Sequence, residues 1–180
     1  MISVGSEIFA QLDCYTDRIP LEVLVQWLHS TSLGVEEVGS YLRFHSDRYM
    51  RNLMYYGPAY QALVLCWRNG QRSPIHDHIG SSCGVKVLRG TALETVFETG
   101  PNGMIYPSRT MILEEGSITG SQDNDIHQVS NLQAEDADLV TLHIYSPALY
   151  TMNIYSLLDG NVNRFDDPVN DEFVVGGAGI

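Results

Sequence analysis

The stretch SPIHDHIGSSCGVKVLRG, residues 73–90, decides the fold. It places His76 and His78 one residue apart, just before a run of alternating apolar residues that is typical of a β-strand. Residues i and i+2 of a strand point to the same face, so we expect both imidazoles on one side of the sheet. Two imidazole nitrogens on one face can share a metal ion. One exposed and one hydrogen-bonded histidine would fit the same pattern.

The spacing around these histidines resembles the first of two motifs that mark the cupin β-barrels. That motif reads G-x5-H-x-H-x4-E-x6-G. Here Gly70, His76, His78 and Gly90 fill their positions, and Cys83 stands where the motif has glutamate. The glycines permit the tight turns that return each strand to the barrel.

A second cupin motif, G-x5-P-x-G-x2-H-x3-N, is matched further along the chain. Gly116, His127 and Asn131 fill its positions, whereas Gln122 and Asn124 replace the proline and the glycine. The two motifs together predict a cupin-type β-barrel, also called a jelly roll.

The cysteine at the glutamate position leaves His76, His78 and His127 as the candidate metal ligands. Non-haem iron(II) oxygenases hold their metal with two histidines and one carboxylate, which leaves three positions open. Replacing the carboxylate by imidazole makes the site one charge more positive, so we expect it to favour an anionic ligand, particularly a thiolate. A three-histidine zinc site is also physically possible, so the ligands alone do not identify the metal.

The pattern of apolar residues changes near residue 58. Before it, apolar residues that recur every three or four positions predict helices over 20–30, 35–44 and 46–56. After it, short apolar runs between turn residues predict strands over 61–67, 83–88, 92–98, 110–115, 138–146 and 151–158. The fold class is therefore mainly β, with short N-terminal helices packed outside the barrel.

The chain is long enough for one domain. We expect residues 1–58 to form an N-terminal helical segment packed on the barrel, and residues 59–180 to form the barrel with a C-terminal strap. That strap, residues 161–180, is polar and then glycine-rich, and nothing in its sequence assigns it chemistry.

Composition limits the possible partners. The 180 residues carry a formal net charge of −12, which disfavours nucleic acid and anionic membrane surfaces. No apolar run approaches the roughly 20 residues that a bilayer requires, and the N-terminus does not read as a secretory signal. The sparse cysteines, Cys14, Cys66 and Cys83, do not suggest a disulfide framework, so we expect a cytoplasmic protein.

Between about residues 47 and 150 the chain resembles the cysteine dioxygenase family, the thiol dioxygenase branch of the cupins. Separated segments carry this resemblance in the family's order, namely DRYMRNL (47–53), LVLCW (63–67), SPIHDH (73–78), Cys83, IHQVSN (126–131) and TLHIYSP (141–147).

The resemblance implies that the protein oxidises L-cysteine with O2 to cysteine sulfinic acid, using one iron(II) ion. In the family three histidines bind the iron, and these fall on His76, His78 and His127. Cysteine chelates the iron through its thiolate and amine, and an arginine that falls on Arg51 holds the substrate carboxylate, with Tyr49 beside it. A guanidinium fork suits a carboxylate because it forms two parallel hydrogen bonds.

The segment TLHIYSP supplies one polar strand face, made by Thr141, His143 and Tyr145. The resemblance implies that Thr141 orients His143, and that His143 orients Tyr145, whose phenol lies near the sulfur and the oxygen. The competing idea is that His143 is a fourth metal ligand. In the family a cysteine at the position of Cys83 can form a thioether with the tyrosine that matches Tyr145, and the bond before Pro147 is cis.

Two alternatives stay open. The substrate could be 3-mercaptopropionate, although that branch typically has glutamine where Arg51 stands. A metal-binding cupin that senses a small molecule without turning it over is the other alternative. From the family resemblance we expect L-cysteine and O2 as the partners. We expect the protein to be a monomer or a weak homo-oligomer.

Overall fold

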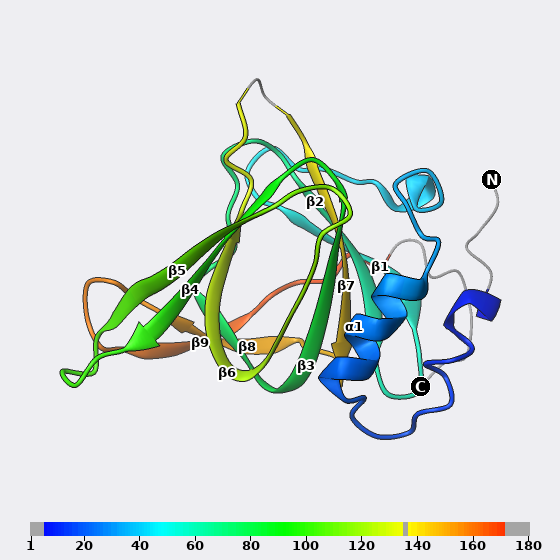
Figure 1. Cartoon of the computed structure of the whole chain (residues 1–180). Helices are drawn as coiled ribbons and strands as arrows, with labels where there is room; N and C mark the ends of the chain where they lie inside the picture. Colours follow the sequence, from blue (N-terminus) through cyan, green and yellow to red (C-terminus); the bar gives the residue numbers. More distant parts are fainter. Residues whose placement is uncertain (1–5, 135–136, 172–180) are drawn as a thin grey trace.

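A curled antiparallel sheet forms the body of the protein (Figure 1). The computed structural model describes residues 6–134 and 137–171, and within them nine strands belong to this sheet. The strands are β1 (Met50–Tyr56), β2 (Gln61–Trp67), β3 (His76–Arg89), β4 (Ala92–Thr99), β5 (Ile105–Leu113), β6 (Ile118–Ser130), β7 (Leu139–Ser146), β8 (Thr151–Tyr155) and β9 (Val162–Asp166). The helical elements are η1 (Ser6–Phe9), α1 (Leu21–Ser30) and η2 (Gly39–Tyr41).

The strand order brings distant parts of the sequence together. The main path runs β1-β2-β7-β3-β6-β4-β5, while β8 pairs with β3 and β9. Because β3 neighbours β6, His76 lies directly opposite His127. Because β3 also neighbours β7, Cys83 lies directly opposite Tyr145. The mainly β fold with a cupin-type barrel is therefore confirmed.

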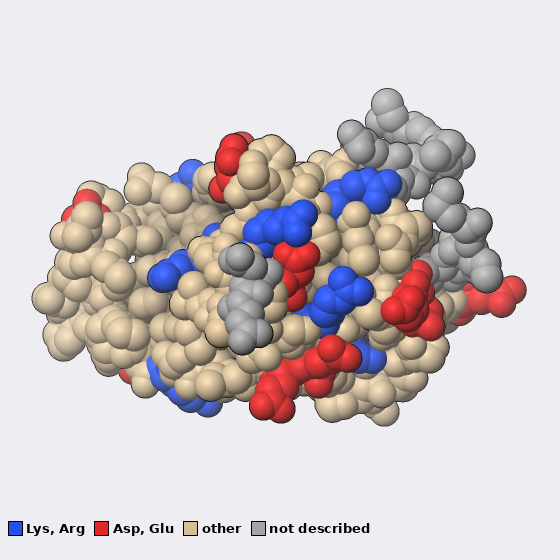
Figure 2. Space-filling model, turned by 90° about the horizontal axis from the view of Figure 1, so that it is seen from above, with Lys and Arg blue, Asp and Glu red and all other residues tan. Residues whose placement is uncertain are grey.

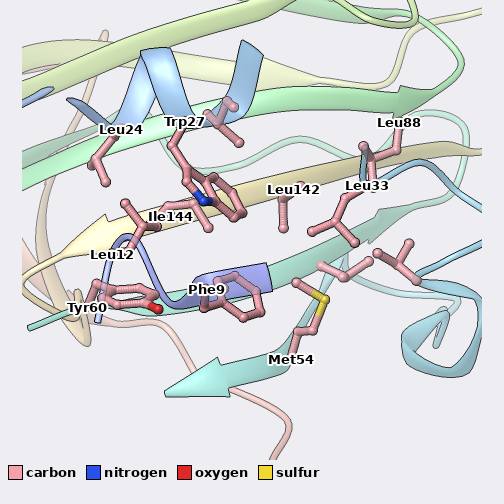
Figure 3. Close-up of a cluster of buried hydrophobic side chains, with 14 of the residues drawn as sticks. Phe9, Leu12, Leu24, Trp27, Leu33, Met54, Tyr60, Leu88, Leu142 and Ile144 are labelled. Carbon is pink, nitrogen blue, oxygen red and sulfur yellow. The ribbon is translucent and has the colours of Figure 1, made fainter. Parts of the chain in front are cut away.

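Strands β2 and β7 are buried on both faces. Their inward side chains, such as Leu65 and Leu139, belong to the apolar cluster inside the barrel. Their outward side chains, such as Val64 and Leu142, pack in a second cluster with Leu24, Trp27 and Leu28 of α1 (Figure 3). Helix α1 and the N-terminal segment thus cover the outside of the sheet, which leaves the barrel interior for the site.

The expected helix over residues 20–30 is confirmed as α1, but the one over 46–56 is wrong. Residues 50–56 form strand β1, whose main chain pairs with β2 along most of its length. Arg51 and Leu53 point into the barrel while Met54 packs outside. Sheet pairing and this alternation outweigh the local helical spacing. The expected helix over 35–44 is also wrong, since only the short η2 forms there.

Two strands differ from the expected ranges. Strand β3 begins at His76 rather than at residue 83. Strand β6 was not expected at all, because it covers a polar stretch that lacks a clear apolar alternation. Part of the expected strap forms β9, and Asn170 bridges to Asn52 of β1. The glycine-rich end of the strap, residues 172–180, lies outside the described residues. The division at residue 58 stays a prediction.

Charged side chains are interspersed on the face seen from above in Figure 2, with Lys and Arg lying beside Asp and Glu. The helices that the structure describes are all too short or too polar to cross a membrane.

The peptide bond between Ser146 and Pro147 is cis, as the family resemblance implied.

Candidate active site

Three buried histidines form a cluster inside the barrel. His76 and His78 come from β3 and His127 comes from β6, and each side chain is at most 5% exposed. One ligand nitrogen from each lies within 4.8 Å of the other two. His143 is outside this cluster, because Thr141 and Tyr145 engage its two ring nitrogens. The structure therefore brings together the three expected ligands.

The protonation of these histidines suits a metal site. Burial, followed by the neighbouring His127, lowers the pKa of His76 to about 3, so its imidazole is neutral. Its Nδ1–H donates to the Pro74 carbonyl at 2.9 Å, which leaves the Nε2 lone pair available. Burial and the same neighbour also hold the pKa of His78 well below its usual value.

Two buried nitrogens in the cluster lack a hydrogen-bond partner in the part of the chain that the structure describes. They are Nδ1 of His78 and Nε2 of His127. Buried polar atoms without a hydrogen bond are uncommon and costly. Because Glu94 engages Nδ1 of His127, a metal ion bound between these rings would satisfy His127 Nε2. The donor set thus fits one divalent metal ion that accepts neutral nitrogen ligands.

A carboxylate stands behind His127. Glu94 of β4 is 3% exposed, and its Oε1 accepts a hydrogen bond from His127 Nδ1 at 2.6 Å. Thr119 donates to the other oxygen at 3.2 Å. Burial favours a raised pKa for Glu94, but the hydrogen bonds from His127 and Thr119 outweigh it and lower the pKa. This carboxylate fixes the ring and leaves Nε2 facing the cluster.

Arg51 reaches the site from β1. Its guanidinium is buried and donates from Nη1 to the Asp167 carbonyl and from Nη2 to the Leu149 carbonyl, both at 2.8 Å. Its Cζ lies 5.4 Å from the centre of the Tyr145 ring. Within residues 6–134 and 137–171 its Nε–H has no hydrogen-bond partner, which leaves a donor for a ligand.

A narrow cavity of about 10 Å³ connects these groups. Arg51 and Tyr49 line it together with His76, His127 and Tyr145. Apolar and aromatic side chains complete the wall, and they include Leu65, Trp67, Val129 and Met152. This space holds about one water molecule, and it adjoins both the histidine cluster and the guanidinium.

A row of hydrogen bonds crosses the barrel interior. Trp67 Nε1–H donates to Thr141 Oγ1 at 3.0 Å, Thr141 lies 2.9 Å from His143 Nε2, and His143 Nδ1 lies 3.1 Å from the Tyr145 hydroxyl. Since the indole can only donate, the contact with Trp67 does not use the Thr141 hydroxyl proton, which is free to be donated to His143 Nε2. The imidazole then carries its proton on Nδ1 and donates it to Tyr145.

The phenol at the end of this row lies beside the histidine cluster. The ring centres of Tyr145 and His78 are 6.0 Å apart. Burial, together with Cys83, holds the pKa of Tyr145 well above its usual value. The hydroxyl therefore stays protonated and has its own hydrogen to donate to a ligand in the cavity.

Cys83 lies on the same inward face as Tyr145 and directly across the strand pair. Both side chains are buried, and Cys83 Sγ is 4.0 Å from His143 Nδ1. Opposed residues of an antiparallel pair have Cβ atoms about 4.5–5.5 Å apart, so the two side chains are neighbours.

Three further residues at the site were not anticipated from the sequence. Glu94 lies at an inward position of its strand, two residues after the apolar Ala92. A carboxylate at an otherwise apolar inward position is a signal from which its role could have been predicted. Trp67 lies in the expected strand over 61–67, where its sequence position gave it no role at the site. Asp167 lies in the strap, where the sequence offers no such signal.

Comparisons with known proteins agree with this site. The family model for cysteine dioxygenase type I matches residues 8–157. Cysteine dioxygenase type 1 of Rattus norvegicus is 29% identical over 177 residues, covering 96% of this chain and 86% of the relative. The Bos taurus protein of the same name is 30% identical over 162 residues, covering 80% of each.

Solved structures support the barrel alone. A protein from Thermus thermophilus is 16% identical with a TM-score of 0.53, covering 65% of this chain and 100% of that chain. A Klebsiella pneumoniae protein described as having a double-stranded β-helix domain is 17% identical with a TM-score of 0.52, covering 66% and 94%. The family match spans most of the sequence, including all three clustered histidines, and the chain belongs to the cysteine dioxygenase type I family.

Proposed function

We propose that the protein is an iron(II)-dependent dioxygenase that oxidises the thiol of L-cysteine to the sulfinic acid. The family and the three-histidine barrel site fit a thiol dioxygenase. The observation that carries the choice of cysteine is the buried Arg51, which lines the same narrow cavity as His76 and His127 and whose Nε–H has no hydrogen-bond partner among the described residues. A substrate with a thiol at one end and a carboxylate at the other would fit these two features.

We propose that His76, His78 and His127 hold the iron, and that cysteine binds it through thiolate and amine. Iron(II), when bound, supplies the redox chemistry with O2 that a protein side chain lacks. Both atoms of O2 enter the product, so that RSH and O2 give RSO2H without another reductant.

The roles of the protein's own groups follow from their positions. Arg51 binds the substrate carboxylate and thereby fixes where the thiol lies relative to the histidine cluster. The Tyr145 hydroxyl donates a hydrogen bond toward the reacting sulfur and oxygen, and His143 and Thr141 hold that hydroxyl in place. The apolar walls keep bulk water out and strengthen these contacts.

We also propose that Cys83 and Tyr145 form a thioether. A bond from Sγ to the ring carbon beside the hydroxyl removes two hydrogens, and O2, which the proposed activity already uses, would be the oxidant. The pairing of the two residues across β3 and β7 supports this crosslink. We further propose that the protein acts in the cytoplasm.

Oxygen uptake by the iron-loaded protein tests the function. L-Cysteine, 3-mercaptopropionate and cysteamine should be compared under the same conditions, with the product of each identified. Because only cysteine offers thiol, amine and carboxylate together, we expect its kcat/KM to exceed the other two by about tenfold or more. A higher kcat/KM for 3-mercaptopropionate would reassign the substrate, and no uptake with any thiol would overturn the activity.

A further inference from the structure

Asp167 already places a carboxylate at the proposed substrate-binding arginine. Its Oδ2 lies 3.6 Å from Arg51 Nη1 and also accepts a hydrogen bond from the Tyr49 hydroxyl. The Asp167 side chain is only 10% exposed. Tyr49 and Arg51 are the two residues expected to bind the substrate carboxylate, so an internal carboxylate already forms an ion pair with the guanidinium and accepts the Tyr49 hydroxyl that a substrate would need.

Asp167 also stands between two cavities. The inner cavity, of about 10 Å³, is lined by His76 and His127 of the histidine cluster, and Asp167 also lines an outer cavity of about 390 Å³. Tyr49, Arg51 and Asp167 line both of them. Since the inner cavity holds about one water molecule, a substrate carboxylate can come to lie against Arg51 only if part of this shared wall moves.

The side chain of Asp167 can move while its backbone stays in place. Its N–H donates to the Tyr150 carbonyl at 3.1 Å, and its own carbonyl accepts from Arg51. Asn170, three residues further on, exchanges main-chain hydrogen bonds with β1. Rotation of one short side chain would therefore free the Tyr49 hydroxyl and break the ion pair with Arg51, while the guanidinium stays held by the two main-chain carbonyls and the strap stays attached.

The outer cavity offers the released carboxylate a favourable position. Arg43 and Arg48 line it, and both are exposed to solvent. A carboxylate that turns outward from Arg51 would therefore move toward two other cations, so its charge would not be left without a counterion.

We propose that Asp167 is a specificity-determining latch, an internal competitor whose carboxylate holds Arg51 and Tyr49 until a substrate carboxylate replaces it. This inference rests on the proposed function and names a residue that controls the same site. The latch weakens the binding of every thiol that places a carboxylate on Arg51. It does not affect a thiol that leaves Arg51 alone.

Two substitutions at Asp167 test the latch on the iron-loaded full chain. Asp167→Asn keeps the size and one acceptor oxygen but removes the charge, and Asp167→Ala removes both. Asp166→Asn is the matched control, because Asp166 is the adjacent residue and bonds to the Thr151 hydroxyl instead. Anaerobic calorimetry would give the Kd for L-cysteine, and oxygen uptake would give KM and kcat for cysteine and for cysteamine.

A latch that is closed about four-fifths of the time weakens apparent affinity about fivefold. We therefore expect Kd and KM for L-cysteine to fall about fivefold in both Asp167 variants, with kcat and the cysteamine constants unchanged. An unchanged or raised Kd would overturn the latch, since a raised value would mean that Asp167 only positions Arg51. An equal fall for cysteamine would also overturn it, as a general loosening of the site. If the wild type turned over no thiol, the proposed function would fail, and the calorimetric comparison would still decide the latch.

Discussion

Glu94 accepts a hydrogen bond from His127 at 2.6 Å, and both side chains are 4% exposed. The cupin motif has a glutamate at the position of Cys83, and here that carboxylate is missing. Glu94 restores a negative charge one hydrogen bond behind the cluster, where it raises the basicity of the imidazole without occupying a metal position. The three-histidine site thus has a carboxylate nearby that would not itself take a ligand position on a bound metal.

Glu94→Gln should weaken metal binding by about 10- to 100-fold, because partners of metal-bound histidines typically have effects of this size. Competition with a chelator of known affinity for iron(II) would measure the change. The matched control is Glu98→Gln, an exposed glutamate on the same strand that bonds to Tyr106. Equal affinities for the two variants would show that Glu94 contributes only to packing.

Arg51→Gln should raise KM for L-cysteine by about 10- to 100-fold, since a hydrogen bond to a charged group contributes about 1.5–3 kcal/mol. Cysteamine has no carboxylate, so its KM should change little. Steady-state oxygen uptake measures both constants, and Arg72→Gln, at an exposed arginine that lines neither cavity, is the control. A parallel loss for the two substrates would remove the carboxylate-binding role.

Tyr145→Phe should lower kcat by about 100-fold while the iron content stays the same, because a positioned proton donor typically contributes at least this much. Turnover and metal content should be measured on the same preparation. Tyr150→Phe, at a half-exposed tyrosine outside the inner cavity, should leave both unchanged. Loss of iron from the Tyr145 variant would instead point to a structural role.

The crosslink predicts a mass two hydrogens below that of the unmodified chain after turnover with cysteine and O2. Denaturing gels of partly converted protein should show two bands. Cys83→Ala should abolish both signs, whereas Cys66→Ala should keep them, because Cys66 packs on the outer side of β2. Persistence of the mass deficit in Cys83→Ala would assign it to another modification.

Much of the site could be predicted because its residues follow motif spacing on single strands. The alternation of a single strand is enough to place two groups of residues on one face. These groups are the pair His76 and His78, and the row Thr141, His143 and Tyr145. His127 required the second motif, and the pairing of β3 with β6 then brought it opposite His76.

The parts that could not be predicted depend on contacts between distant segments. Residues 46–56 have apolar spacings that fit a helix, and only the pairing with β2 makes them a strand. Asp167 lies 116 residues after Arg51 in a polar tail, and no local pattern indicates that the tail returns to β1. The sequence signal for Glu94 is weak. Its strand shows an ordinary alternation of apolar and polar residues, and only the position of His127 beside it shows its role.

Anaerobic titration of the metal-free protein with iron(II) tests the central claim most directly. The wild type should bind one iron per chain, and so should His29→Ala and His45→Ala, which change exposed histidines outside the cluster. Single alanine variants of His76, His78 and His127 should each lose at least tenfold in affinity. Full-affinity binding by a variant that lacks all three clustered histidines would contradict the account.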